Sequence, residues 1–194
     1  MYLIGITGLI GSGKTTVGNI LKKMGYVVFD MDVWCRKMYF DTAFLKVIKE
    51  SFPYSFQNNI FNKKILRKRV FEDKKELNKL ENLTHPYLIK KLKKIIHKNK
   101  FSNNIFFIET ALLYQMKLDK FCSNVICTVA PFDVMEKRVI FRDNISKKEY
   151  DNIISKQIIY ENFNQKSDFK LDTNTSFGII QKNLIYILKE IEHC

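Results

Sequence analysis

A stretch near the start of the chain has the residue types and the spacing of a phosphate-binding loop. Glycine, four residues and then Gly-Lys-Thr form the P-loop pattern, in which backbone N–H groups turn inward around phosphate oxygens at residues without a Cβ. The residues that form this stretch are Gly8, Gly11, Ser12, Gly13, Lys14, Thr15 and Thr16. Lys14 can reach the β- and γ-phosphates, and the Thr15 hydroxyl can bind Mg²⁺. The pattern predicts a site for a nucleoside triphosphate, ATP or GTP, together with Mg²⁺.

Two carboxylates follow the next apolar run of the sequence. Residues 26–29 are predicted to form a short strand that ends in Asp30-Met31-Asp32. Because side chains alternate along a strand, Asp30 and Asp32 are expected to share a face and to point toward the loop. One carboxylate can orient or deprotonate an attacking hydroxyl, and the other can hold a magnesium-bound water. The alternative is a turn or a helix cap, where Asp is common, but the preceding loop favours the functional interpretation.

Basic side chains that suit phosphoryl transfer occur further along the chain. Arg138 and Arg142 are four residues apart in a helical pattern, so they are expected on one face, where they can clamp phosphates as a lid closes. The alternative is a solvated helix in which they pair with Glu136 or Asp143. The His-Pro pair at His85 is expected to start a helix. That histidine can contact a substrate, although a lone histidine is more often a cap or a structural donor.

These residues need a sheet that brings the ends of its strands together. The predicted core elements are strands at 2–7, 26–29, 105–109, 124–129 and 169–172, and helices at 15–24 and from 176 onward. A strand, a glycine loop, a helix and a second strand in this order are typical of a parallel, doubly wound α/β sheet, which binds ligands at the carboxyl ends of its strands. We therefore expect one three-layer α/β domain.

Two segments are expected to interrupt this core, which itself comprises residues 1–32, 101–131 and 166–194. Residues 33–100 have helical periodicity and no strong strand, so they are predicted to form a helical insertion. A connection of this length in a compact α/β domain is more often functional than a plain linker. Residues 132–165 are helical and charged and are expected to form the lid.

The composition is that of a globular protein with anionic partners. The chain has 194 residues, of which 46% are hydrophobic, and a formal net charge of +13. That charge suits nucleotide phosphates or nucleic acid, but lysines spread over solvated helix faces produce it as well. The four cysteines form no Cys-x-x-Cys pair and are expected to be reduced thiols of a cytoplasmic protein. Since no secretory signal is recognised and no apolar run approaches ~18 residues, no membrane partner is expected.

Taken in order, these residues resemble the dephospho-CoA kinase family. The resemblance is carried by Gly8 to Thr15, Asp30-x-Asp32-x-x-x-Arg36, Leu66 to Phe71, His85-Pro86-x-x-Ile89, Leu112-Leu113, Arg138-x-x-x-Arg142-Asp143, Gln157 and Asp168 to Asn174. It covers nearly the whole chain. It implies a P-loop kinase core with a parallel sheet, a helical CoA domain and a mobile lid. The activity it implies is transfer of the γ-phosphoryl group of ATP to the ribose 3′-hydroxyl of dephospho-CoA, the last step of coenzyme A synthesis.

The same resemblance assigns roles to individual residues. It implies that Asp32 is the base that faces the 3′-hydroxyl, that Arg36 and His85 face the acceptor, and that Arg138 and Arg142 lie on the lid. The partners it implies are ATP and dephospho-CoA. We expect no specific nucleic acid partner, and a monomer or a weak homo-oligomer.

Several positions depart from the family pattern. The aspartate usual at the end of the third strand is a glutamate here, and six other usual residues are also replaced. The replaced positions are Asn62, Lys63, Glu109, Ala111, Gln115, Met135 and Ile153. The phosphate loop and the proposed base are retained, so the departures bear on acceptor affinity more than on the type of reaction.

Two other functions remain open at the level of sequence. Another small-molecule P-loop kinase, acting on a nucleoside, a nucleotide or a small alcohol, shares the loop and the fold. A GTPase switch or an ATP-dependent module on nucleic acid is a different class. The sequence has no Asn-Lys-x-Asp segment to read guanine, and its basic residues do not form an interleaved aromatic platform.

Overall fold

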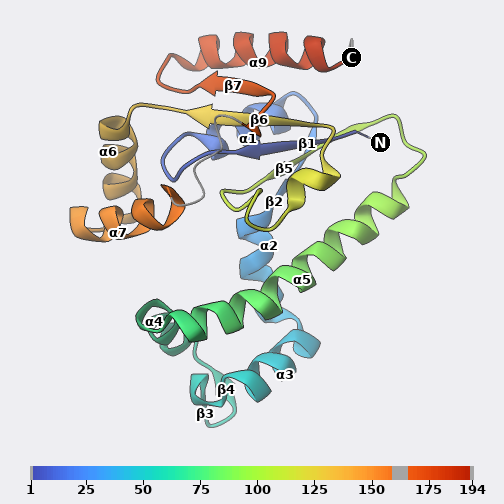
Figure 1. The fold of residues 1–194 in the computed structure, drawn as a ribbon. Helices are drawn as coiled ribbons and strands as arrows, with labels where there is room; N and C mark the ends of the chain where they lie inside the picture. Colours follow the sequence, from blue (N-terminus) through green and yellow to red (C-terminus); the bar gives the residue numbers. More distant parts are fainter. Residues whose placement is uncertain (1, 159–165, 193–194) are drawn as a thin grey trace. The chain divides into compact units, whose positions relative to one another are not determined.

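The computed structural model describes residues 2–158 and 166–192, and the chain divides into two compact units (Figure 1). The first, here called the core unit, comprises residues 1–30 and 100–194. The second, here called the helical unit, comprises residues 31–99. Of the predicted core and lid, residues 1, 159–165 and 193–194 lie outside the described residues.

The core unit is built on a five-stranded sheet. Its strands are β1 (Tyr2–Thr7), β2 (Val27–Asp30), β5 (Ile105–Glu109), β6 (Asn124–Val129) and β7 (Phe169–Asp172). The strand order is β2-β5-β1-β6-β7 and every pairing is parallel, which confirms the predicted α/β fold. The chain leaves β1 toward one side of the sheet and later returns to its other side. The carboxyl end of β1 is therefore a topological switch point, where α/β proteins bind ligands.

The alternation of side chains along β1 explains what covers each face of the sheet. Ile4 and Ile6 are fully buried among side chains of two helices, α1 (Lys14–Lys23) and α9 (Phe177–Glu192). Gly5 points to the opposite face, where a Cβ would lie 2.9 Å from Leu113. The chain between β5 and β6, which includes the short 3-10 helix η3 (Leu118–Phe121), supplies that contact. The core thus sits on both sides of the central strand.

Two further helices of the core unit pack beside the phosphate loop. They are α6 (Phe132–Asp143) and α7 (Lys147–Ile158). Val139 of α6 and Tyr150 of α7 form a small buried cluster, against which Leu9 and Ile10 of the loop pack. Asn144 ends α6 with a left-handed φ of 50°, a conformation that Asn tolerates better than most residues. The predicted helical character of this segment is confirmed over 132–158.

The helical unit consists of four α-helices, two short 3-10 helices and one small hairpin. Its elements are α2 (Met31–Lys37), η1 (Met38–Phe40), α3 (Thr42–Ser51), η2 (Pro53–Ser55), β3 (Phe56–Gln57), β4 (Ile60–Phe61), α4 (Lys63–Glu72) and α5 (Lys74–Lys98). Side-chain caps start three of the helices: Asp41 for α3, Asn62 for α4 and Asp73 for α5. The sequence did not predict the hairpin, whose turn places Asn58 and Asn59 at positive φ.

Two local expectations are wrong. Asp30 ends β2, but Met31 already begins α2, so Asp32 lies in a helix and does not share a strand face with Asp30. Residues two apart on a helix point in different directions. The proline after His85 lies inside α5 and does not start it, because the cap at Asp73 begins the helix at Lys74, twelve residues before Pro86. That proline removes one backbone hydrogen bond from the interior of α5.

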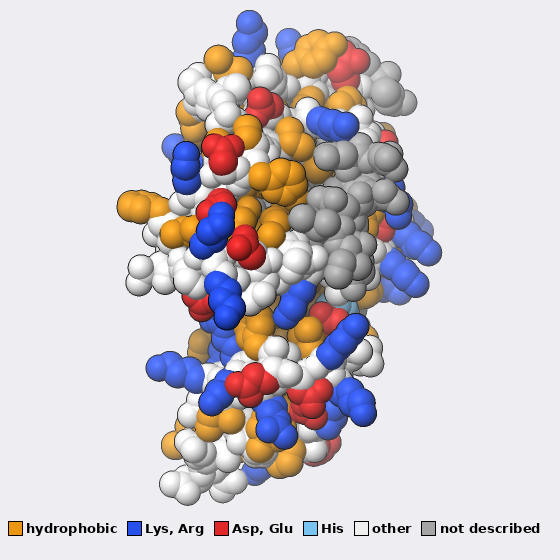
Figure 2. All heavy atoms as spheres, turned by 60° about the vertical axis from the view of Figure 1, so that its left-hand side comes forward, with side chains coloured by type: hydrophobic (Ala, Val, Ile, Leu, Met, Phe, Trp, Pro, Cys, Tyr) orange, Lys and Arg blue, Asp and Glu red, His pale blue; other side chains and the backbone are white. Residues whose placement is uncertain are grey.

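The positive charge is distributed unevenly along the chain. Residues 31–99 contain 17 Lys and Arg and 7 Asp and Glu, a net charge of +10 out of the +13 of the chain. On the face drawn in Figure 2, Lys and Arg side chains are interspersed with carboxylates and apolar side chains. Among the described residues no helix has the length and apolar character needed to cross a membrane.

Candidate active site

The phosphate loop connects the central strand β1 to helix α1. Gly8, Gly11 and Gly13 have positive φ angles of 141°, 82° and 90°. A Cβ at Gly8 would lie 2.5 Å from the carbonyl oxygen of Thr128, and one at Gly13 would lie 2.6 Å from the Thr173 hydroxyl. Both the backbone conformation and the close packing therefore require glycine. The N-terminus of α1 follows directly and adds the positive end of a helix dipole.

Hydrogen bonds between hydroxyl groups and the backbone join the phosphate loop to the sheet. The Thr128 hydroxyl donates to the Thr7 carbonyl oxygen over 3.1 Å and lies 2.7 Å from the Ser12 hydroxyl. Since the Thr128 hydrogen is already used, Ser12 is the donor of this second hydrogen bond. Ser12 is buried. The Ser12 side chain thus links the loop to β6.

Arg138 ties α6 to the loop and to the segment after β7. Its guanidinium donates to the Gly11 carbonyl oxygen over 3.2 Å, to the Thr173 hydroxyl over 3.1 Å and to the Thr173 carbonyl oxygen over 2.8 Å. Thr173 in turn donates its hydroxyl to the Ser12 carbonyl oxygen over 2.8 Å. Lys14 Nζ donates to the carbonyl oxygens of Gly8 and Leu9 over 2.9 and 3.0 Å. Both cations are held next to the loop.

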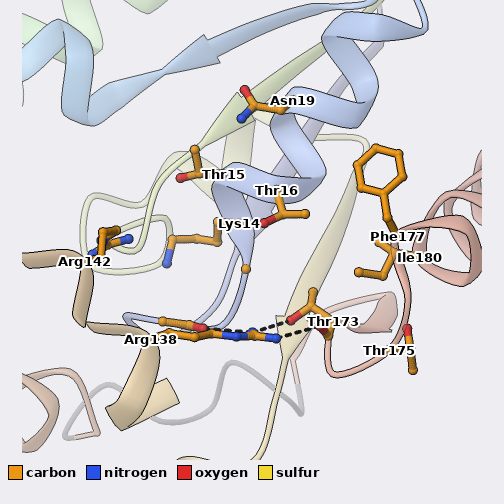
Figure 3. A pocket seen from close by; sticks show the side chains of 12 residues that line it. Lys14, Thr15, Thr16, Asn19, Arg138, Arg142, Thr173, Thr175, Phe177 and Ile180 are labelled. Atoms are coloured by element: carbon orange, nitrogen blue, oxygen red, sulfur yellow. Dashed lines mark hydrogen bonds between the residues drawn. The ribbon is translucent and has the colours of Figure 1, made fainter. Parts of the chain in front are cut away.

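A cavity of about 560 Å³ opens above these groups (Figure 3). It is lined by Gly11, Gly13, Lys14, Thr15, Thr16, Asn19, Arg138, Arg142, Thr173, Thr175, Phe177 and Ile180. Figure 3 shows the N-terminus of α1 on one side of the cavity and the segment from Thr173 to Ile180 on the other. Three of the lining side chains are basic and none is acidic. Backbone N–H groups, a helix N-terminus and fixed cations together make a site for a polyphosphate.

The last residue of β5, Glu109, contacts the first turn of α1 directly after the phosphate loop. Glu109 is buried, and its Oε1 accepts a hydrogen bond from the Thr15 hydroxyl over 2.8 Å. Burial raises the pKa of Glu109, and the hydrogen bond from Thr15 partly offsets that shift. Asp30 is its register partner on β2 and raises the pKa further. A hydroxyl and a carboxylate side by side are the oxygen ligands that Mg²⁺ prefers, so this pair fits the ion.

The remaining candidates in the core unit lie on α6 and α7. Arg142 lines the cavity and donates two hydrogen bonds to the carboxylate of Asp143, over 2.8 and 2.7 Å. The same Arg142 therefore fits both the phosphate-clamp and the ion-pair interpretations. Gln157 accepts a hydrogen bond from the Ile10 backbone N–H over 2.8 Å, which joins α7 to the loop.

The candidates in the helical unit lie on two helices. Asp32 and Arg36 are exposed and four residues apart on α2, hence on one face. His85 is half-buried on α5, and burial lowers its pKa while the Glu81 carboxylate partly offsets the shift. Helices α2 and α5 pack together, and Lys91 Nζ lies 4.7 Å from the centre of the Trp34 ring. The cavity lining described above comes entirely from the core unit.

Sequence reasoning missed the cavity residues beyond the loop and the arginines. Thr173 follows β7 directly, and Thr175 and Phe177 come shortly after it. Their signal was positional, because the carboxyl ends of parallel strands share one edge of a sheet. The segment 168–174 belonged to the family resemblance, but no residue in it carried an assigned contact. Glu109 was recognised as a departure, not as the partner of Thr15.

Comparisons with known proteins agree with this geometry. The model of the dephospho-CoA kinase family matches residues 2–178. The dephospho-CoA kinase of Fusobacterium nucleatum is 31% identical over 190 residues, covering 95% of each chain. That of Borreliella burgdorferi is 34% identical over 201 residues, covering 98% of this chain and 91% of the relative. The solved structure of dephospho-CoA kinase from Campylobacter jejuni is 25% identical, with a TM-score of 0.72 and coverage of 97% of this chain and 96% of that one.

The family model spans the phosphate loop, the helical unit, Arg138 and Arg142, and the relatives align over nearly their full length. The fold, the loop and the full-length similarity therefore agree, and the chain belongs to the dephospho-CoA kinase family of phosphotransferases.

Proposed function

We propose that this protein transfers the γ-phosphoryl group of ATP to the ribose 3′-hydroxyl of dephospho-CoA, which gives coenzyme A and ADP. The observation that carries the proposal is the phosphate-binding cavity, with Lys14 and Arg138 held beside the loop, in a chain that matches this family over residues 2–178. The family supplies the acceptor, and the cavity supplies the donor site.

In the proposed donor complex the loop amides and Lys14 bind the β- and γ-phosphates. Phe177 and Ile180 line the far side of the cavity, so their apolar surface suits the base of the nucleotide. Thr15 and Glu109 would hold Mg²⁺ at the phosphates. Bound there, the ion would neutralise charge on the β- and γ-phosphate oxygens.

In the proposed transfer Asp32 accepts the proton of the 3′-hydroxyl as that oxygen attacks the γ-phosphorus and the bond to the β-phosphate oxygen breaks. Asp32 is exposed and lies in the first turn of α2, directly after β2. Arg36, one helical turn later, and His85 on α5 are proposed to face the acceptor. These three assignments rest on the family resemblance and on the placement of the residues within the helical unit.

The lid is proposed to comprise residues 132–165, with Arg138 and Arg142 as the groups that neutralise charge on the transferring phosphoryl group. Both arginines line the cavity from α6, which supports this assignment. A monomer or weak homo-oligomer and a cytoplasmic location remain predictions from the sequence.

The test is a steady-state assay with magnesium-ATP and dephospho-CoA that detects coenzyme A itself. Wild-type protein should form coenzyme A, and Lys14→Ala should lower its rate at least about 100-fold, because a preorganised charge on the phosphates is lost. Lys137→Ala is the matched control, since Lys137 is an exposed α6 residue whose ion pair with Asp133 lies on the surface. The rate with Lys137→Ala should match that of wild type.

The alternative acceptor classes are tested in the same assay. Nucleosides, nucleoside monophosphates and small alcohols replace dephospho-CoA, and ADP formation is followed. Faster turnover of any of these than of dephospho-CoA would assign the chain to another P-loop kinase activity. Folded protein that binds ATP but forms no coenzyme A would refute the proposed acceptor while leaving the donor site intact.

A further inference from the structure

A buried carboxylate oxygen next to the phosphate loop has no hydrogen-bond partner among the described residues. It is Oε2 of Glu109, whose other carboxylate oxygen, Oε1, accepts a hydrogen bond from Thr15. Leaving such an oxygen unpaired in a protein interior is costly, so its position needs a physical reason. The charged groups that act on this carboxyl are Asp30, Lys14 and Lys22.

The group that Oε2 faces is the backbone of helix α1 at Gly18. A Cβ built on Gly18 would lie only 2.5 Å from Glu109 Oε2, closer than real Cβ contacts allow. Gly18 is buried in the interior of α1 and does not have the positive φ that would require glycine. Since glycine is a poorer helix former than alanine, its presence here reflects the space that it leaves.

We infer that Gly18 is a positioning residue for the glutamate at the end of β5. The missing side chain leaves room for Oε2, and this room lets a carboxylate as long as glutamate turn its other oxygen toward the Thr15 hydroxyl. Any side chain at position 18 displaces Glu109 from Thr15. An aspartate at position 109 would be shorter and would need less of this space, so Gly18 and Glu109 act as a matched pair.

The inference deepens the proposed function, because Thr15 and Glu109 are there the groups that hold Mg²⁺. Its test needs no acceptor. The dissociation constant of ATP is measured by calorimetry with and without Mg²⁺, and the ratio of the two constants gives the gain in affinity due to the ion. Wild type, Gly18→Ala, Glu109→Asp and the double variant are compared.

Gly18→Ala should lower the magnesium gain about 10-fold, the size of effect seen when a group that orients a metal ligand is disturbed. Glu109→Asp should lower it too, because the shortened carboxylate can turn into the open space beside Gly18. In the double variant the alanine Cβ fills that space and directs the aspartate toward Thr15, so the gain should return to within about threefold of wild type. Recovery in the double variant is the signature of a matched pair.

Gly178→Ala is the matched control, since Gly178 also lies in a helix but a Cβ there meets nothing within 4 Å. It should keep the full magnesium gain. Thermal melting of each variant without nucleotide separates effects on packing from effects on metal binding. If Gly18 served packing alone, Gly18→Ala would lower the melting temperature and leave the magnesium gain unchanged. That result, or a double variant no better than Gly18→Ala, would overturn the inference. Absence of any magnesium gain in wild type would instead refute the proposed metal site, and this inference with it.

Discussion

In the core unit the side chains proposed to bind and transfer phosphate form hydrogen bonds with the loop and with one another. In the helical unit the proposed functional residues are spread over two helices. Arg138 contacts both the loop and Thr173, and Thr15 contacts Glu109. Asp32 in the helical unit is exposed on α2, and His85 lies on α5. The two units thus offer two different kinds of proposed anion site. Backbone cradles need particular residues at particular places, while a charged helical surface can be built in many ways.

The two units also differ in net charge. The helical unit carries +10 in 69 residues, which leaves +3 for the rest of the chain. Several of its cations lie over aromatic rings, such as Lys63 over Tyr39 and Lys79 over Phe52. A cation held over a ring is partly ordered, yet it remains available to a polyanion. These contacts each join one cation to one ring, so the prediction that the basic residues form no aromatic platform for nucleic acid stays a prediction.

The departures from the family pattern also differ between the units. In the helical unit Asn62 stands in place of an aspartate and still caps α4, accepting from the backbone N–H groups of Lys64 and Ile65. Asn and Asp are equivalent caps, so this change is mild. In the core unit Glu109 stands in place of an aspartate beside the phosphate loop, where one methylene changes the geometry. A tightly packed site requires a compensating residue, and Gly18 fits that requirement.

The largest effect should come from the helical unit despite its open arrangement. Asp32→Asn removes the proposed base and should lower kcat about 10²- to 10⁴-fold, with the dissociation constant of ATP unchanged. Asp73→Asn is the matched control, because asparagine caps α5 as well as aspartate does. Steady-state kinetics and calorimetry check both variants. An unchanged kcat for Asp32→Asn would contradict the proposed base and would leave the core unit as the source of all the catalytic groups.

The two arginines of α6, Arg138 and Arg142, should respond differently to the same change. Arg138→Lys keeps the charge but loses the planar fork that joins Gly11 to Thr173, so kcat/KM should fall about 10- to 100-fold and the melting temperature should fall as well. Arg142→Lys should lower kcat/KM but leave the melting temperature unchanged, because its pair with Asp143 is largely exposed. Equal melting temperatures for the two variants would contradict the structural role of Arg138.

Ionic strength should affect binding by the helical unit more than binding by the core unit, by a few-fold. Raising ionic strength weakens long-range attraction to exposed lysines more than contacts inside a packed cavity. The double change Lys90→Ala and Lys94→Ala, on one exposed face of α5, should raise KM for dephospho-CoA a few-fold and flatten its dependence on salt. Lys182→Ala with Lys189→Ala on α9 of the core unit is the control. The same rise in KM in both would show that only net charge matters.

The smallest effect should be a dependence of stability on pH. Because burial raises the pKa of Glu109 above its ordinary value of 4.5, the folded protein binds this proton more tightly than the unfolded chain does. Stability is therefore lost as pH rises from that value through the folded pKa. Glu109→Gln should remove the loss, so its melting temperature should exceed that of wild type by a few degrees at pH 7 and by less at pH 5. Magnesium-free melts check this, and a difference independent of pH would contradict it.

The sequence by itself determined the elements whose signals are local. The glycine loop lies between an apolar strand and an amphipathic helix, and the predicted strands at 105–109, 124–129 and 169–172 have those bounds in the structure. The prediction that Arg138 and Arg142 lie on one helix is also confirmed. These features follow from hydrophobic periodicity and from the steric freedom of glycine, which neighbouring residues decide.

Only the tertiary structure decided which distant residues meet. Glu109 and Thr15 are 94 residues apart, and Arg138 and Thr173 are 35 apart. Their contacts arise because parallel strands end at one edge of the sheet, a fact that no local pattern carries. The predicted boundaries of secondary structure near Asp32 and His85 were wrong because they relied on local patterns alone. Helix α5 begins after its cap at Asp73, and α2 begins at Met31 directly after β2, so the local patterns at Asp32 and His85 mark neither start.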